Sequence, residues 1–137
     1  MYYEPEVITF VPWDDKVILI AEDEEVNYKF LEAVLRKSHA KILRAKNGLE
    51  ALDLCKNVKS IDLILMDLRM PVMDGYEAAN EIFKLRSDLP IIAQTAFTSD
   101  DELLKCKDSG FTDFVTKPID IRKLIKKINS LFNLKSK

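Results

Sequence analysis

The sequence is poor in cysteine and histidine, and this scarcity limits the chemistry that the chain can support. Its two cysteines, Cys55 and Cys106, lie far apart and form no CxxC pair, so we interpret them as reduced thiols of a cytosolic domain. The only histidine, His39, comes at the end of an expected helix. Because a relay histidine needs a helix face on a bundle, we expect His39 to be an ordinary surface residue.

Long hydrophobic runs and an excess of charge are missing as well. No segment approaches the roughly 20 apolar residues of a membrane-spanning helix, and the first residues lack the basic and apolar segments of a secretory signal. The formal net charge is only −2, which argues against a general nucleic-acid binder. We therefore expect a cytoplasmic protein that contacts no nucleic acid and, by itself, no membrane.

The sequence does contain a regular alternation of strand-like and helix-like segments. Short apolar runs predict five strands, at residues 16–21, 41–45, 61–66, 90–95 and 111–116. Helical spacing or a capping signature follows each run and predicts helices that start near residues 24, 47, 74, 99 and 119. Three of these helices open with Asn47, Asp74 or Ser99, each three residues before a glutamate that could complete a capping box.

Five such repeats predict an α/β fold, in which helices cover both faces of one parallel sheet. Five strands suit the flavodoxin-like, doubly wound order 2-1-3-4-5, which makes the first and third strands neighbours. A chain of 137 residues has the size of one compact domain. We place this domain at residues 16–134, after a linker or N-terminal extension at 1–15 and before a C-terminal tail at 135–137.

The segment from Ile61 to Gly75, IDLILMDLRMPVMDG, has the strongest local signals. Its apolar run predicts a buried strand, and the run ends on Asp67. Pro71 and the capping residue Asp74 follow, so a rigid loop leads from the strand into a helix. Ionised carboxylates are rare at the end of a buried strand unless something binds them, which makes Asp67 a candidate functional residue.

Other polar side chains stand at equivalent positions, where the remaining strands end. They are Glu22 and Asp23 after the first strand, Thr95 at the end of the fourth, and Lys117 after the fifth. Carboxylates crowded at one edge of a sheet repel one another unless a cation intervenes, and an oxygen-only ligand set suits Mg²⁺. Acids, metal, hydroxyl and ammonium together predict a site for a phosphoryl group bonded to a carboxylate.

Four motifs resemble those of the receiver domain of response regulators, the CheY-like superfamily of two-component signalling. They are ILIAED at 18–23, LILMDLRMPVMDG at 63–75, IIAQTA at 91–96 and FVTKPI at 114–119. The resemblance runs from Lys16 to about Phe132 and is specific because the four motifs occur together in this order and spacing. It implies the flavodoxin-like fold and transfer of a phosphoryl group from a phosphohistidine.

The resemblance also implies a role for each residue around the acidic site. Asp67 matches the phospho-accepting aspartate. Asp23 and Asp67 would bind Mg²⁺ directly together with the backbone carbonyl of Arg69, and Glu22 would act mainly through water. Glu22 stands where an aspartate is commoner, although it keeps the charge.

The remaining implied roles concern the switch between two conformations. The Thr95 hydroxyl would bond the phosphoryl oxygen, and Lys117 would pair with the phosphoryl group. Lys117-Pro118 would be a cis peptide bond. Phe114 occupies the aromatic position that turns inward on activation, and it lacks the hydroxyl of the tyrosine that could stand there.

Two other functional classes are weighed against a phospho-accepting receiver. A phosphohydrolase of the haloacid dehalogenase type needs a second acid two residues after its nucleophile, and Arg69 occupies that position here. A pseudo-receiver that binds partners without phosphorylation would not need the complete set of acceptor residues. The receiver interpretation includes slow dephosphorylation by the domain itself.

The resemblance implies a histidine kinase or a histidine phosphotransfer domain as the partner, and it leaves a weak homodimer open. The chain is either a single-domain response regulator or the receiver of a hybrid histidine kinase. The segment EDEEVN and the lead-in with its aromatics and prolines favour the hybrid kinase. Val26 and Phe30 widen the apolar face of the first helix near the acids, so we expect part of this face to be exposed for docking.

Overall fold

A five-stranded parallel sheet forms the centre of a computed structural model that describes residues 12–96 and 99–132. The strands are β1 (Val17–Ala21), β2 (Lys41–Ala45), β3 (Leu63–Asp67), β4 (Ile91–Thr95) and β5 (Asp113–Thr116). Their order, β2-β1-β3-β4-β5, confirms the predicted flavodoxin-like topology. Asp67 is the last residue of β3 itself, one position later than the end predicted for that strand.

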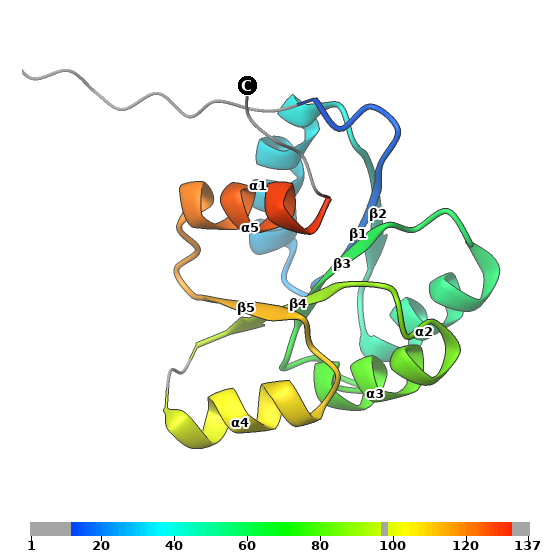
Figure 1. Ribbon diagram of the computed structural model, residues 1–137, viewed down its shortest axis with the longest axis vertical. Coiled ribbons are helices and arrows are strands. Elements are labelled where there is room, and N and C mark those ends of the chain that lie inside the picture. The colour runs from blue at the N-terminus through cyan, green and yellow to red at the C-terminus, as the bar shows by residue number, and fades with distance from the viewer. Residues whose placement is uncertain (1–11, 97–98, 133–137) are drawn as a thin grey trace, which may run out of the picture.

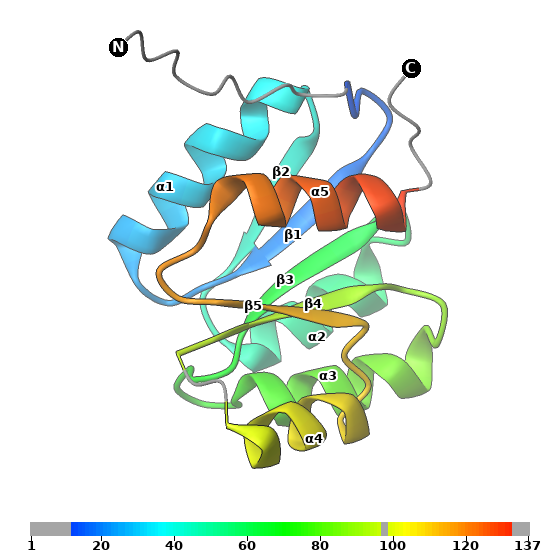
Figure 2. The ribbon, with the colours of Figure 1, turned by 60° about the vertical axis from the view of Figure 1, so that its left-hand side comes forward.

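Helices cover both faces of this sheet (Figures 1 and 2). They are α1 (Glu25–Leu35), α2 (Gly48–Asn57), α3 (Gly75–Leu85), α4 (Asp100–Asp108) and α5 (Ile121–Leu131), with a short 3-10 turn at Arg36–Ser38. On one face α1 and α5 pack on Ile18 and Ile20 of β1, and on the other face α2, α3 and α4 cover Leu19 and Ala21. The alternation along β1 therefore divides the core into two layers.

The predicted N-caps form, but Glu50 and Glu102 bind groups other than the backbone amide of their cap residue. The side chains of Asn47, Asp74 and Ser99 accept hydrogen bonds from the amides three residues later, at 2.8, 2.9 and 3.2 Å. Glu50 accepts a hydrogen bond from the amide of Lys46, one residue before its cap. Asp120 is a further cap that sequence patterns did not identify, and for this reason α5 begins at Ile121 instead of 119.

Helix α1 buries a different face from its most regular apolar stripe. Tyr28, Leu31 and Leu35 point into the core, whereas Val26 is 80% exposed and Phe30 is 49% exposed. The expectation that part of the apolar face lies in solvent is therefore correct. The exposed residues lie at the start of the helix, close to the end of β1.

The packed body of the protein begins before Lys16. The indole of Trp13 is only 1% exposed and packs edge-on against Phe132, and its Nε1 donates a hydrogen bond to Oδ1 of Asn129 at 2.8 Å. Trp13 belongs to the segment expected to be a linker or extension, yet it fills the core between α1 and α5. Residues 1–11 of that segment and the tail at 135–137 lie outside the described residues, so this division of the chain stays a prediction.

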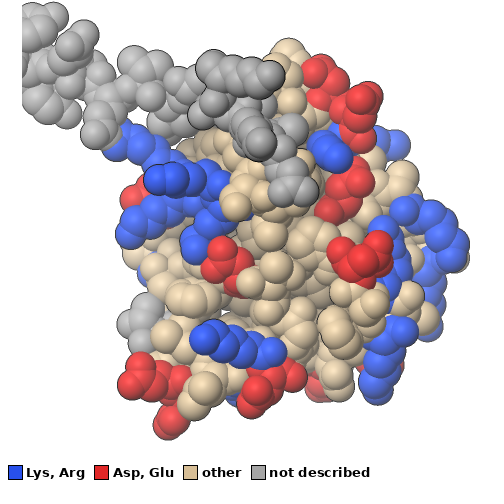
Figure 3. Space-filling model, in the orientation of Figure 1, with Lys and Arg blue, Asp and Glu red and all other residues tan. Residues whose placement is uncertain are grey.

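His39 and the two cysteines have the ordinary surroundings that the sequence predicts. His39 is exposed and lies 3.2 Å from Asp14, and the two cysteines are free, buried thiols. On α5, the basic residues Arg122, Lys123 and Lys126 are exposed, and Figure 3 shows basic side chains gathered on this side of the molecule. Within the described ranges, none of the helices has the length and apolar character needed to span a membrane.

The buried indole generates a stability prediction. Trp13→Ala removes a large side chain from a close-packed layer and leaves the Asn129 amide without its partner, so we expect the free energy of unfolding to fall by about 3–5 kcal/mol. Urea denaturation measures this loss. Phe83→Ala, which truncates a half-exposed ring on α3, should cost only about 1 kcal/mol. An unchanged urea midpoint for Trp13→Ala would show that the segment before Lys16 does not stabilise the domain.

Candidate functional site

The predicted site residues meet at the carboxyl ends of four strands. Glu22 and Asp23 follow β1, Asp67 ends β3, Thr95 ends β4 and Lys117 follows β5. Because β1 and β3 pair directly, with Ala21 opposite Met66, the residues that come next in each strand are neighbours. The crossover topology therefore brings together residues that are up to 95 positions apart in the chain.

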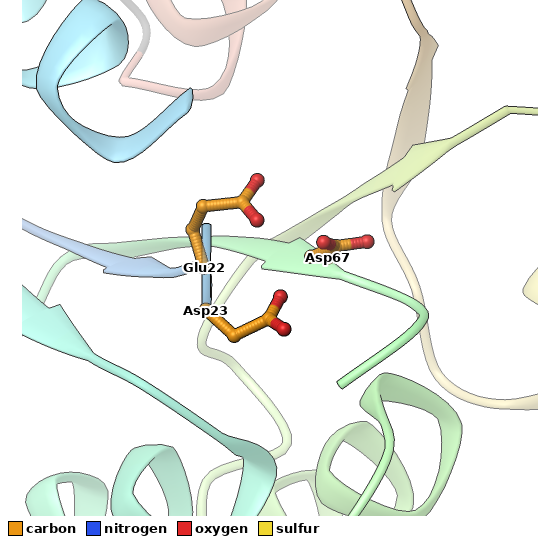
Figure 4. A group of neighbouring side chains, drawn as sticks. All are labelled: Glu22, Asp23 and Asp67. Carbon is orange, nitrogen blue, oxygen red and sulfur yellow. The ribbon is translucent and has the colours of Figure 1, made fainter. Parts of the chain in front are cut away.

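Three carboxyl groups form the acidic part of the site. Figure 4 shows the side chains of Glu22 and Asp23 extending from the end of β1 toward Asp67. One carboxylate oxygen from each of the three residues lies within 4.8 Å of the other two. Glu22 is fully buried and Asp67 is 5% exposed, whereas Asp23 is open to solvent. One side of the acidic group is thus accessible, while its other side is sealed in the protein.

Lys117 supplies the positive charge at this site. Its Nζ lies 3.2 Å from Oδ2 of Asp67 and 3.6 Å from Oε1 of Glu22. Burial lowers the pKa of the Lys117 ammonium, but the attraction of Asp67 and Glu22 outweighs it, and the net change is a raised pKa. The Lys117-Pro118 peptide bond is cis, as predicted, and the amide of Lys117 donates to the carbonyl of Thr95.

Glu22 is the group most perturbed by this crowding. Burial, and then the neighbouring Asp67 carboxylate, raise the pKa of Glu22 from 4.5 to about 7. Among the described residues, its Oε1 has no hydrogen-bond partner. A buried carboxylate oxygen that accepts no hydrogen bond, beside two further carboxylates, is suited to a divalent cation and its bound water. The donor set is therefore compatible with Mg²⁺.

Backbone packing holds Asp67 in place. The amide of Arg69 donates to Oδ1 of Asp67 at 3.2 Å, so the loop folds back over the carboxylate. At the start of α3, a Cβ on Gly75 would overlap the backbone carbonyl of Asp67. Only glycine permits this close approach, which explains why the Asp74-Gly75 pair follows the Pro71 loop.

Glu102 was not identified as a site residue from the sequence. It lines a pocket of about 250 Å³ together with Asp67, Thr95 and Lys117. Its Oε1 accepts a hydrogen bond from the Tyr76 hydroxyl at 2.7 Å and lies 3.5 Å from Oγ1 of Thr95. Its position three residues after Ser99 was attributed to helix capping alone. For this reason its contact with Thr95 at the site was not predicted.

Phe114 lies on β5 opposite Ala93 and is partly buried against the core layer of α2, α3 and α4. The ammonium of Lys127 lies 5.8 Å from the centre of its ring and also bonds both carboxylate oxygens of Asp113 at 3.0 Å. The ring thus lies at the β5 edge of the sheet, within reach of the Lys127 ammonium of α5. Its role as a switch stays a prediction.

The raised pKa of Glu22 generates a prediction for the metal-free protein. The folded state binds the Glu22 proton more tightly than the unfolded state does, so the free energy of unfolding should fall as pH rises from about 4.5 to about 7. Glu22→Gln removes this penalty, and its stability relative to wild type should rise by roughly 1–3 kcal/mol between pH 5 and pH 8. Urea denaturation in the presence of a chelator measures the difference.

The control for this prediction is Glu77→Gln, which neutralises an exposed glutamate on α3. Its stability difference from wild type should not change with pH in the same range. A Glu22→Gln difference that is equally flat would show that Glu22 is ionised throughout.

Comparisons with known proteins agree with this geometry. The family model of the response regulator receiver domain matches residues 18–129. The peroxide stress-activated histidine kinase mak1 of Schizosaccharomyces pombe is 39% identical in an alignment of 123 residues that covers 85% of this chain and 8% of that kinase. The chain therefore spans only a small part of this relative.

Two solved structures are similar over nearly their whole length. The receiver domain of the Saccharomyces cerevisiae response regulator Ssk1, in complex with the histidine phosphotransfer protein Ypd1, has a TM-score of 0.81 and 33% identity, covering 90% of each chain. The receiver domain of the Pseudomonas aeruginosa sensor histidine kinase PA1611 carries a magnesium ion in its active site cleft. It has a TM-score of 0.80 and 32% identity, covering 86% of this chain and 98% of that one. From its sequence motifs, its topology and these matches, the chain belongs to the response regulator receiver domain family of two-component signalling.

Proposed function

We propose that Asp67 accepts a phosphoryl group from a phosphohistidine, and that Glu22, Asp23, Asp67 and the backbone carbonyl of Arg69 hold Mg²⁺ during the transfer. The observation that carries this proposal is the meeting of three carboxylates and Lys117 at one edge of the sheet, beside a small pocket that Asp67 and Lys117 line. The magnesium-bearing receiver of PA1611 supports it. When bound, the metal supplies positive charge that offsets the repulsion between the acids and the phosphoryl group.

The residues of this chain divide the work of the transfer. An Asp67 carboxylate oxygen attacks phosphorus in line while the bond from phosphorus to the imidazole nitrogen breaks. The imidazole, protonated on its other ring nitrogen, keeps the electron pair and leaves as a neutral ring. Lys117, now paired with Asp67 at 3.2 Å, neutralises charge on the phosphoryl oxygens, and the Thr95 hydroxyl donates to one of them.

The switch follows from this last hydrogen bond. A hydroxyl has a single proton, so Thr95 cannot donate to Glu102 and to a phosphoryl oxygen at once. Phosphorylation therefore draws Thr95 toward Asp67, and Phe114 turns inward into the space beside it. The change alters the surface around β4 and β5, which a partner can recognise.

The phosphodonor docks on the start of α1. Val26 and Phe30 are exposed there, and Phe30 lines a pocket of about 250 Å³ with Asn27, Lys117 and Pro118. This pocket shares Lys117 with the pocket that Asp67, Thr95 and Glu102 line, so a partner seated on α1 reaches the site directly. The complex of the Ssk1 receiver with Ypd1 supports a histidine phosphotransfer domain or a histidine kinase as the partner.

The wider setting is that of a cytoplasmic phosphorelay. The likeness to mak1 supports the receiver of a hybrid histidine kinase as the setting of this chain. A single-domain response regulator would use the same site and differ only in what the chain is attached to.

The first test concerns the acceptor. Incubation with Mg²⁺ and acetyl phosphate should modify the peptide that contains Asp67, and Asp67→Asn should lower incorporation by roughly 100-fold because an amide is a poor nucleophile. Asp53→Asn, which changes an exposed residue of α2, should incorporate phosphate normally. Peptide mapping by mass spectrometry locates the label. Equal labelling of Asp67→Asn and wild type would refute the assignment.

The second test concerns docking. Val26→Glu should leave phosphorylation by acetyl phosphate intact but slow transfer from a histidine-phosphorylated partner by roughly 10- to 100-fold, because an unpaired charge in an apolar contact is costly. Both rates are measured on the same variant, with phosphorylated Ypd1 as the donor for the second rate. The control is Leu85→Glu, an equivalent change on the exposed surface of α3.

The pattern of the two rates decides the outcome. Equal loss in both reactions would mean that Val26→Glu damages the fold or the site. Slowing by Leu85→Glu as well as by Val26→Glu would show that added charge alone opposes the partner.

A further inference from the structure

Arg44 lies at the end of the edge strand β2, in register with Ile20 of β1. Paired residues of neighbouring strands point to the same face of a sheet, and Ile20 points toward α1 and α5. The Arg44 side chain therefore runs along the start of α1, and it is only 14% exposed. No sequence motif marks this residue.

The guanidinium of Arg44 binds the segment between β1 and α1 at several points. Its Nε and Nη2 lie 3.3 and 3.1 Å from the backbone carbonyl of Glu22, and Nη2 lies 3.5 Å from that of Asp23. Its Nη1 donates to Oε2 of Glu25 at 2.6 Å, and its Cζ lies 4.3 Å from the centre of the Tyr28 ring. One planar group thus contacts four residues of the short segment 22–28.

The two carbonyls belong to the residues that supply acids to the site. β1 ends at Ala21 and α1 begins only at Glu25, so Glu22 and Asp23 lie between the sheet and the first helix. Fixing the carbonyls of Glu22 and Asp23 fixes the stretch of backbone from which their carboxylate side chains extend. Figure 4 shows both carboxylates directed at Asp67, as a metal site requires.

We propose that Arg44 is a positioning residue for the metal site, which it orders through backbone carbonyls without touching the metal. This inference rests on the proposed Mg²⁺ site. Arginine is suited to the task because its nitrogens form a rigid fork that can donate to several acceptors at once. Lysine has one donor nitrogen on a flexible chain and cannot hold both carbonyls and Glu25 together.

The charge of Arg44 and its contacts with the backbone should have opposite effects on Mg²⁺ affinity. This difference separates the proposal from a simple electrostatic effect. A positive charge near the acids opposes Mg²⁺, so its removal should tighten binding if charge alone matters. Loss of an ordering contact should weaken binding. Arg44→Gln removes both the charge and the fork, whereas Arg44→Lys keeps the charge and removes only the fork.

The test is a Mg²⁺ titration of the full 137-residue chain, followed by amide chemical shifts. We expect Arg44→Gln and Arg44→Lys to bind Mg²⁺ roughly 5- to 10-fold more weakly than wild type. The control is Lys46→Gln, which removes an exposed charge whose field also reaches Glu25. It should bind Mg²⁺ as well as wild type or slightly more tightly.

A second readout needs no metal. In the metal-free protein, hydrogen exchange at the amides of residues 22–25 should become faster in both Arg44 variants and stay unchanged in Lys46→Gln. Arg44→Lys retains the charge and the aliphatic stem, so it provides the measurement even where Arg44→Gln unfolds.

Two outcomes would overturn the role of Arg44. Arg44→Gln could bind Mg²⁺ as tightly as wild type or more tightly, or Arg44→Lys could match wild type in both affinity and exchange. Failure of the wild-type chain to bind Mg²⁺ is a different result, because it would refute the proposed function itself.

Discussion

The carboxylates of Glu22 and Asp67 lie side by side at the end of a buried sheet. The repulsion between these two negative charges governs the rest of the site. Burial, and then the neighbouring Asp67 carboxylate, raise the pKa of Glu22 to about 7, so the ionised pair is unfavourable here. Lys117 offsets part of the repulsion with contacts of 3.2 and 3.6 Å. The site is thus suited to added positive charge, such as that of the divalent cation proposed above.

The sheet must be rigid to hold such an arrangement. Direct pairing of β1 with β3 fixes the distance between the two acids, and the backbone approach at Gly75 stops Asp67 from retreating. Gln94, next to the site on β4, is 1% exposed, and its amide atoms have no hydrogen-bond partner in the part of the chain that the structure describes. Among the described residues, three of the five buried side-chain atoms that lack a hydrogen bond thus belong to Glu22 and Gln94 at the functional edge. The apolar layers on both faces supply the stability that offsets this cost.

The topology and the acidic residues of the site could be predicted from the sequence because local sequence patterns indicate both. Apolar runs mark the strands, and Asp67 stands out as a charge at the end of one of them. The boundary near Trp13 could not be predicted, since an isolated tryptophan carries no period and its partner Asn129 is 116 residues away. Glu102 and Arg44 were missed for a related reason: each resembles a common local feature, and only the fold shows what it faces.

The exposed apolar start of α1 follows from the same constraint as the acidic site. Acids at the end of β1 must lie at the sheet edge, so the helix that follows them begins beside the site with one face turned to the core and another to solvent. Tyr28 and Leu31 occupy the core face, which leaves Val26 and Phe30 outside. Exposed apolar side chains add little to folding, but here Phe30 lines the pocket that contains Lys117. The connection between β1 and α1 therefore joins the acids of the site to the surface that we propose for partner docking.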